Sequence, residues 1–172
     1  MTAVLLFSLC LFPVMAVAQT APAQAPAPVQ AEAVLLTVTG TGGTALRLTA
    51  ADLAKLPRQT VRAADRGQEA ASFEGIPLGE LARLAGAPLG DAVKHGDAPN
   101  WYVVVESKDG YHTLFALAEL DPAFQDKGIL LVDRKEGKPL GDTDGPLRIV
   151  APGEKRHARW ARQVTGIRVG RM

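Results

Sequence analysis

The stretch GPLRIVAPGEKRHARW, residues 145–160, decides most of the fold that the sequence predicts. Its apolar first half predicts a β-strand, and Pro152-Gly153 predicts the turn that ends this strand. Cationic side chains and a tryptophan follow at once. From residue 145 onward the cations are Arg148, Lys155, Arg156, Arg159, Arg162, Arg168 and Arg171, against Glu154 as the sole carboxylate side chain. Because the whole chain has a formal net charge of +1, this crowding indicates one local anion site.

The overall composition excludes some classes of protein. Nucleic-acid-binding proteins usually have a high overall pI, and this nearly neutral chain does not, so no nucleic acid is expected as a partner. A hydrophobic content of 47% in 172 residues is enough for one globular domain with a core of its own.

The N-terminal residues predict export. The run AVLLFSLCLFPVMAVA, residues 3–18, is apolar and uncharged, and its final AVA has the small-x-small form of a signal-peptidase site. We therefore expect a signal peptide over residues 1–18, a disordered Ala/Pro/Gln linker over residues 19–33 and a folded domain over residues 34–172. The mature protein would be periplasmic or secreted, with no stable membrane span. An uncleaved anchor is the alternative.

The position of the only cysteine limits the chemistry. Cys10 lies within the predicted signal peptide, so the mature chain would contain no thiol. Haem attachment, iron–sulfur clusters, zinc–thiolate sites and cysteine nucleophiles are not expected in such a chain.

The folded part predicts an α+β domain rich in strands, either a mixed sheet or a barrel-like sheet, with two or three short helices. Residues 101–116, WYVVVESKDGYHTLFA, predict a β-hairpin that turns at Asp109-Gly110. Thr49 predicts the start of a short helix that stops before Pro57, and residues 73–86 predict a second helix with Pro77 near its first position and Gly86 after its end. No alternation of strands with long helices is present, which argues against a parallel α/β fold.

The basic loop is the candidate site, with alternatives left open. Arginine forks and the backbone N–H groups of a turn suit phosphate or carboxylate oxygens, and Trp160 would form a wall for a planar ligand. The alternative is a solvated charged loop that Trp160 anchors in the core. His112 does not form a Ser-His-Asp triad with Ser107 and Asp109, because residues so close along one hairpin cannot align as such a triad. His95 has no second histidine at ligand spacing, so neither a catalytic residue nor a metal ligand is assigned.

Several motifs in order resemble one family. Residues 128–169, with Gly137, Pro139, Leu140, the run GPLRIVAP and the basic loop before Trp160, resemble the C-terminal part of the molybdopterin-binding domain of the sulfite oxidase superfamily. FEGIPLGELARLAG and SKDGYHTLFALAEL resemble segments further upstream in that domain. The resemblance covers about residues 73–169 and implies the sulfite-oxidase-like fold.

The resemblance also implies the role of the basic loop, which in that family helps to hold the pterin and its phosphate. It assigns Arg148, Lys155, Arg156, His157, Arg159 and Trp160 to cofactor binding, with Tyr111 and His112 as weaker candidates for the pocket rim. The implied cofactor is molybdopterin. The family's oxidoreductases bind molybdenum through a cysteine thiolate from the N-terminal portion of the domain, and here that portion is largely missing.

Three functions remain open. The first, which we favour, is a periplasmic protein of this fold that binds a pterin-type or other phosphorylated anion without redox turnover. The second is a molybdenum-dependent oxidoreductase with a cysteine-free site or one that a periplasmic redox partner completes. The third is a non-catalytic interaction module that kept only the fold.

Overall fold

The computed structural model describes residues 32–94 and 96–172. The predicted signal peptide and residues 19–31 of the predicted linker lie outside the described residues. Residues Glu32–Met172 form one compact unit, close to the expected domain of residues 34–172. No helix in this described part combines the length and the apolar character that a membrane span requires.

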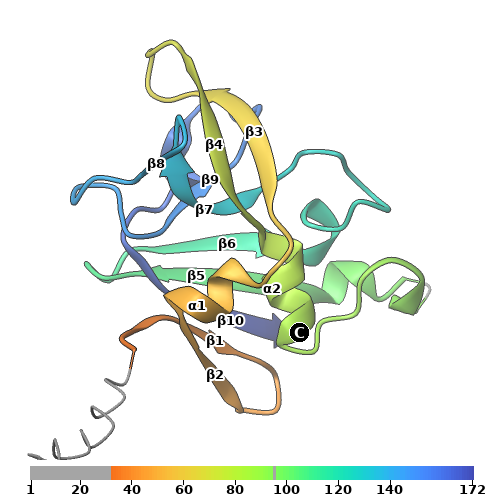
Figure 1. Cartoon of the computed structure of the whole chain (residues 1–172). Coiled ribbons are helices and arrows are strands. Elements are labelled where there is room, and N and C mark those ends of the chain that lie inside the picture. Colours follow the sequence, from red (N-terminus) through yellow and green to blue (C-terminus); the bar gives the residue numbers. More distant parts are fainter. Residues whose placement is uncertain (1–31, 95) are drawn as a thin grey trace, which may run out of the picture. The chain divides into compact units, whose positions relative to one another are not determined.

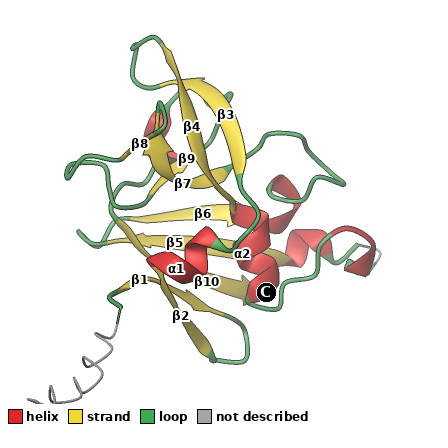
Figure 2. Ribbon diagram, viewed as in Figure 1, coloured by secondary structure: helices red, strands yellow, loops and turns green. Residues whose placement is uncertain are grey.

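Two five-stranded sheets make up the described part of the chain (Figure 2). The first sheet has the order β2–β1–β10–β5–β6, with β1 (Val34–Thr39), β2 (Ala45–Thr49), β5 (Trp101–Ser107), β6 (His112–Ala116) and β10 (Val164–Arg171). The second has the order β3–β4–β7–β8, and β9 also pairs with β7; its strands are β3 (Gln59–Ala64), β4 (Ala70–Pro77), β7 (Leu130–Lys135), β8 (Lys138–Pro139) and β9 (Arg148–Val150).

These sheets confirm an α+β fold without βαβ units. Among the strands of the described residues, β1 and β10 are the one pair that runs parallel, and they come from opposite ends of the unit. Both sheets keep free edges within the described residues, so the barrel-like form that we also allowed is not closed. The chain passes between the sheets through one short helix after β2 and another after β4, and within the part of the chain that the structure describes no strand of one sheet pairs with a strand of the other.

The helices are short and begin as the sequence predicts. In α1 (Ala50–Ala54), the Thr49 side chain accepts from the Asp52 N–H, and the Asp52 carboxylate accepts from the Thr49 N–H in return. The helix α2 (Leu78–Leu84) follows β4 directly, with Pro77 at its N-cap and Gly86 at a φ of 89° after its end. The region between α2 and β5 holds two short 3₁₀ turns, Gly90–Ala92 and Ala98–Asn100.

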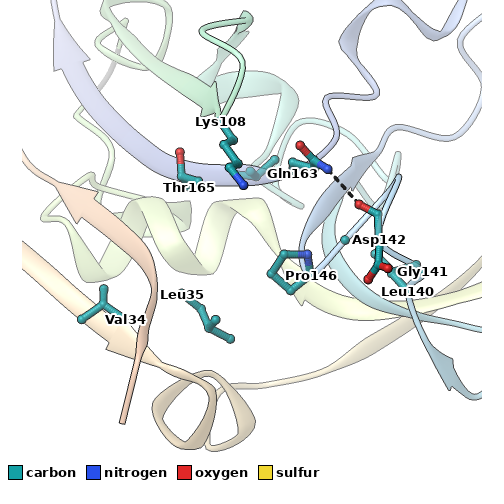
Figure 3. A pocket seen from close by; sticks show the side chains of 11 residues that line it. Val34, Leu35, Lys108, Leu140, Gly141, Asp142, Pro146, Gln163 and Thr165 are labelled. Atoms are coloured by element: carbon teal, nitrogen blue, oxygen red, sulfur yellow. Dashed lines mark hydrogen bonds between the residues drawn. The ribbon is translucent and has the colours of Figure 1, made fainter. Parts of the chain in front are cut away.

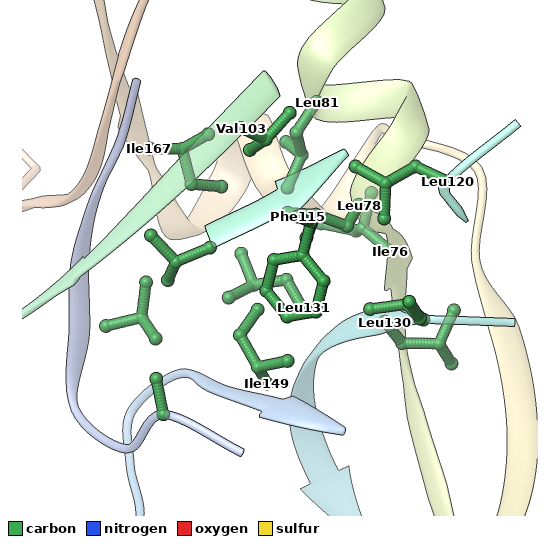
Figure 4. Packing of buried hydrophobic residues seen from close by; sticks show 14 of the residues in the cluster. Ile76, Leu78, Leu81, Val103, Phe115, Leu120, Leu130, Leu131, Ile149 and Ile167 are labelled. Atoms are coloured by element: carbon green, nitrogen blue, oxygen red, sulfur yellow. The ribbon is translucent and has the colours of Figure 1, made fainter. Parts of the chain in front are cut away.

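The core lies where the two sheets and α2 meet (Figure 4). Phe115 of β6 is fully buried at its centre, with Leu78 and Leu81 of α2 on one side and Leu131 and Ile149 of the second sheet on the other. Burial of such large apolar side chains stabilises the fold by roughly 1.5–3 kcal/mol for each of them. This core fixes the β3–β4 hairpin, the β5–β6 hairpin and the loop between β9 and β10 relative to one another (Figure 1).

Candidate functional site

Trp160 anchors the basic loop in the core. Its side chain is 5% exposed, and its indole N–H donates to the Ala151 carbonyl at 3.0 Å. The ring meets Phe73 edge-on at 6.1 Å and His157 edge-on at 4.4 Å between centroids. The tryptophan therefore holds His157 and the 3₁₀ turn His157–Arg159 in a fixed position at the surface.

Arg148 lies beneath this loop, away from solvent. Only 1% of its side chain is exposed, and its guanidinium is 2.9 Å from a carboxylate oxygen of Asp65 and 2.9 Å from one of Asp144. The guanidinium also faces the rings of Phe73 and Trp160, at 5.8 and 5.5 Å from their centroids. The structure thus places Arg148 in a buried ion pair that supports the loop from below.

Arg159 connects the basic loop to the turn after β6. Its guanidinium binds both Glu119, at 3.0 Å, and Glu154, at 2.7 Å, and lies 4.5 Å from the centroid of Phe115. Burial by itself would lower the pKa of Arg159, but the hydrogen bonds to the two carboxylates outweigh it and raise that pKa. The charge of Arg159 is therefore already neutralised within the protein.

Lys155 and Arg156 are exposed on the loop, and neither forms an ion pair within residues 32–94 and 96–172. His112 also lies apart from the loop. Its side chain points to the outer face of the first sheet, with its Nε2 atom 3.8 Å from the Glu106 carboxylate.

A cavity of about 330 Å³ lies between the basic loop, the β5–β6 hairpin and the β3–β4 hairpin. Of the residues that the sequence predicts for the site, it brings together His157, Trp160 and Tyr111. Its full lining is Arg66, Ser107, Asp109, Tyr111, His157, Ala158, Trp160, Ala161 and Arg162. The Tyr111 hydroxyl donates to the Ala158 carbonyl at 2.8 Å and so links the hairpin to the loop.

Six lining residues were not predicted from the sequence as site residues: Arg66, Ser107, Asp109, Ala158, Ala161 and Arg162. Arg66 occupies the turn between β3 and β4 with a φ of 46°, a backbone conformation that costs a non-glycine residue about 1 kcal/mol or more. Arg162 holds its Nε atom 3.0 Å from Asp144, the carboxylate that also binds Arg148. The Ser107 side chain is buried, and its hydroxyl has no partner in the described residues.

The cavity therefore combines two arginine side chains with one histidine. Arg66, His157 and Arg162 come from two separate segments, and Asp109 is the sole carboxylate among the lining side chains. Such a cavity suits an anion that also carries hydrogen-bonding groups. Within the described residues, no three His, Cys, Asp or Glu side chains are grouped as metal ligands.

The comparisons with known proteins concern the family and the fold of the chain. The family model of the oxidoreductase molybdopterin binding domain matches residues 23–172. Among solved structures, the chain is similar to the sulfane dehydrogenase SoxCD from Paracoccus pantotrophus, with a TM-score of 0.58 and 21% sequence identity. That match covers 78% of this chain and 37% of the SoxCD chain, so this chain spans little more than a third of that relative's length.

No curated protein matches the sequence. At 21% identity, the likeness to SoxCD shows a shared fold, in agreement with the sulfite-oxidase-like fold expected from the basic loop. The family model covers most of the chain, from the linker to the last residue. The chain therefore belongs to the oxidoreductase molybdopterin binding domain family.

Proposed function

We propose that this domain binds a phosphorylated pterin-type cofactor in the 330 Å³ cavity, as an exported protein without redox turnover of its own. The observation that carries the proposal is the pair of arginines, Arg66 and Arg162, that line one cavity together with the ring of His157. The guanidinium fork of arginine matches the oxygens of a phosphate and forms two parallel hydrogen bonds with them.

The lining fits the anionic end of such a cofactor. Arg66 is exposed and forms no ion pair with a carboxylate of the described chain, so binding a phosphate would break no existing contact. Asp109 would accept hydrogen bonds from the N–H groups that a pterin ring carries, and the exposed ring of Tyr111 would cover one side of it.

The lining does not fit a metal that needs a protein thiolate. When bound, a molybdopterin supplies its own dithiolene sulfurs as ligands for molybdenum. A cysteine would complete this site as it does in the oxidoreductases, and the sequence has Cys10 alone, outside the described residues. This donor set supports a binding protein over an enzyme.

Export is part of the proposal. It rests on the apolar residues 3–18 and on the AVA at residues 16–18. A signal peptide cut after Ala18 would also remove Cys10, so the mature protein would lack a thiol.

A molybdenum-dependent oxidoreductase is the second candidate. Membership of an oxidoreductase family favours it. The chain covers 37% of the SoxCD chain, so a partner or a further segment could supply the protein thiolate for molybdenum. It differs from the first proposal in requiring molybdenum at stoichiometric amounts.

Calorimetric titration with a pterin monophosphate tests the binding site. We expect saturable binding to the wild-type protein, and a loss of affinity of about tenfold or more in Arg66→Gln, since a hydrogen bond to a charged group contributes about 1.5–3 kcal/mol. Arg47→Gln is the matched control, because Arg47 is exposed on β2 and lines none of this cavity. Equal affinity of the Arg66→Gln and Arg47→Gln variants would place the ligand elsewhere, and a wild-type protein that binds neither pterin monophosphate nor inorganic phosphate would refute the proposal.

A further inference from the structure

A second, larger cavity of about 560 Å³ lies next to the proposed cofactor site (Figure 3). Lys108, Gln163 and Thr165 lie along one side of it, with Val34 and Leu35 of β1 across from them. Its remaining lining is Leu140, Gly141, Asp142, Gly145, Pro146 and Val164.

The two cavities are lined by neighbouring residues of the same two segments. Ser107 and Asp109 line the cofactor cavity while Lys108 lines the larger one, and Arg162 lines the first while Gln163 lines the second. The Lys108 N–H donates to the Gln163 carbonyl at 2.9 Å, and this hydrogen bond joins the two segments between the two cavities.

Gln163 is held firmly in an unusual conformation. Its φ is 48°, in the left-handed region that a residue with a side chain rarely adopts. Its backbone N–H donates to the Asp144 carbonyl at 3.1 Å, and its side-chain amide donates to the Asp142 carbonyl at 2.8 Å. These contacts, together with the one from Lys108, fix this wall of the cavity. Non-glycine residues held in this region cluster at functional sites.

The larger cavity is mostly apolar and contains one cation. Val34, Leu35, Leu140, Pro146 and Val164 supply the apolar surface. The Lys108 ammonium group forms no ion pair with any carboxylate of residues 32–94 and 96–172. The lining also contains one carboxylate, that of Asp142, on the loop after Leu140. A cavity that joins an apolar surface to a few charged groups is typical of a site for a small amphipathic molecule.

The sheet topology argues against an extended peptide as the occupant. β1 already pairs with β2 and β10, and β10 already pairs with β1 and β5. A peptide could pair here only with the short stretch of β1 before Thr37, where the ladder between β1 and β10 ends. The volume of about 560 Å³ lies within the range of about 300–1,000 Å³ that small-molecule sites occupy.

We infer that this cavity is a second binding site, which takes a small carboxylate with an apolar body and pairs its carboxylate with Lys108. The inference does not depend on the cofactor proposal, since no residue lines both cavities. Either one can fail while the other holds.

Nuclear magnetic resonance titration with hexanoate tests this site, with hexan-1-ol as the uncharged probe of the same length. We expect saturable shifts of the backbone N–H groups of Leu35, Gly141 and Thr165 with hexanoate. Lys108→Met should weaken hexanoate about fivefold, as expected for a partly exposed ion pair, and leave hexan-1-ol unchanged. Lys127→Met is the matched control, because Lys127 is exposed and outside the cavity lining.

A second variant, Val34→Trp, tests the site even if the Lys108 ammonium group contributes little to the affinity for hexanoate. Val34 is 39% exposed, so its replacement should leave the fold intact while the larger ring fills the cavity and abolishes binding of both probes. The inference is overturned if hexanoate causes no saturable shift at these positions, or if Lys108→Met binds it as the wild type does. Binding at these positions of a peptide that ends in leucine, without binding of hexanoate, would also overturn it. So would shifts at these positions that depend on protein concentration in the absence of any probe, because they would indicate that a second copy of the chain occupies the site.

Discussion

Arg148 and Asp65 form a buried ion pair, with 2.9 Å between guanidinium nitrogen and carboxylate oxygen. Arg148 is in β9 and Asp65 follows β3, so the pair joins two strands of the second sheet that are not neighbours. Arg66, the next residue, lines the cofactor cavity. A charge pair beneath the site thus holds the cationic turn above it in place.

Asp65→Ala should therefore destabilise the protein strongly. It leaves Arg148 buried with Asp144 as its remaining carboxylate, and removing one partner of a buried pair costs about 3 kcal/mol or more. Urea unfolding at neutral pH would measure the loss. Asp142→Ala, an exposed aspartate nearby, should stay within about 0.5 kcal/mol of the wild type. A loss below 1 kcal/mol in Asp65→Ala would show that the pair contributes little to the fold.

Arg159→Ala should affect stability more than ligand binding. Arg159 binds Glu119 and Glu154 and covers Phe115, and solvent screening limits the expected cost to about 1–2 kcal/mol. Affinity for pterin monophosphate should change by less than about twofold, since the side chain lies outside the cavity lining. Unchanged stability with abolished binding would instead support the role in anion binding that the sequence predicted. Arg156→Ala, which removes an exposed loop cation, is the comparison.

The pH dependence of stability should include a contribution from Asp97. Hydrogen bonds from Arg171, Asn100 and Trp101 lower the pKa of its carboxyl from 3.8 to about 2. Because the pKa is lower in the folded state, the stabilisation is complete above the unfolded pKa and is lost as the pH falls from about 4 to about 2. Asp97→Asn should flatten the stability curve over this range, as followed by urea unfolding at several pH values. Identical curves for the variant and the wild type would contradict this assignment.

Gly75 in β4 should tolerate no side chain. A Cβ atom there would overlap the Leu131 carbonyl oxygen and the Val132 Cα atom of the neighbouring β7, and backbone cannot move aside as a side chain can. Gly75→Ala should cost about 3 kcal/mol, at the upper end for an overpacked core. Gly42→Ala is the control, since its Cβ would meet nothing within 4 Å. Thermal unfolding compares the two, and an equal Tm for both would show that β4 and β7 can separate at little cost.

Much of the local structure could be predicted because its signals are local. The Asp109-Gly110 turn, the capping residues Thr49 and Asp52 of α1, and Gly86 after α2 all lie where the sequence indicates. The strand β4 was missed. Its Gly75 and Pro77 were interpreted as the approach to a helix, whereas pairing with β3 and β7, the latter far along the chain, makes this segment a strand.

The site could be predicted only in part, because its geometry depends on distant segments. The basic loop was found from its charge, and His157 and Trp160 do line the cavity. The partners of Arg148 and Arg159 were not visible from the sequence: Asp65 and Glu119 lie 83 and 40 residues away. Arg66 completes the cavity from a turn that carries no motif of its own.

The most direct test of the account is cofactor analysis of the protein purified from cells that make molybdopterin. Pterin would be measured by fluorescence after oxidation, and molybdenum by mass spectrometry, in the wild type and in Arg66→Gln. The account predicts stoichiometric pterin in the wild type, loss of that pterin in Arg66→Gln, and no molybdenum above the level of the variant. Stoichiometric molybdenum would contradict the account in favour of an oxidoreductase, and absence of pterin would contradict it in favour of a domain that kept only the fold.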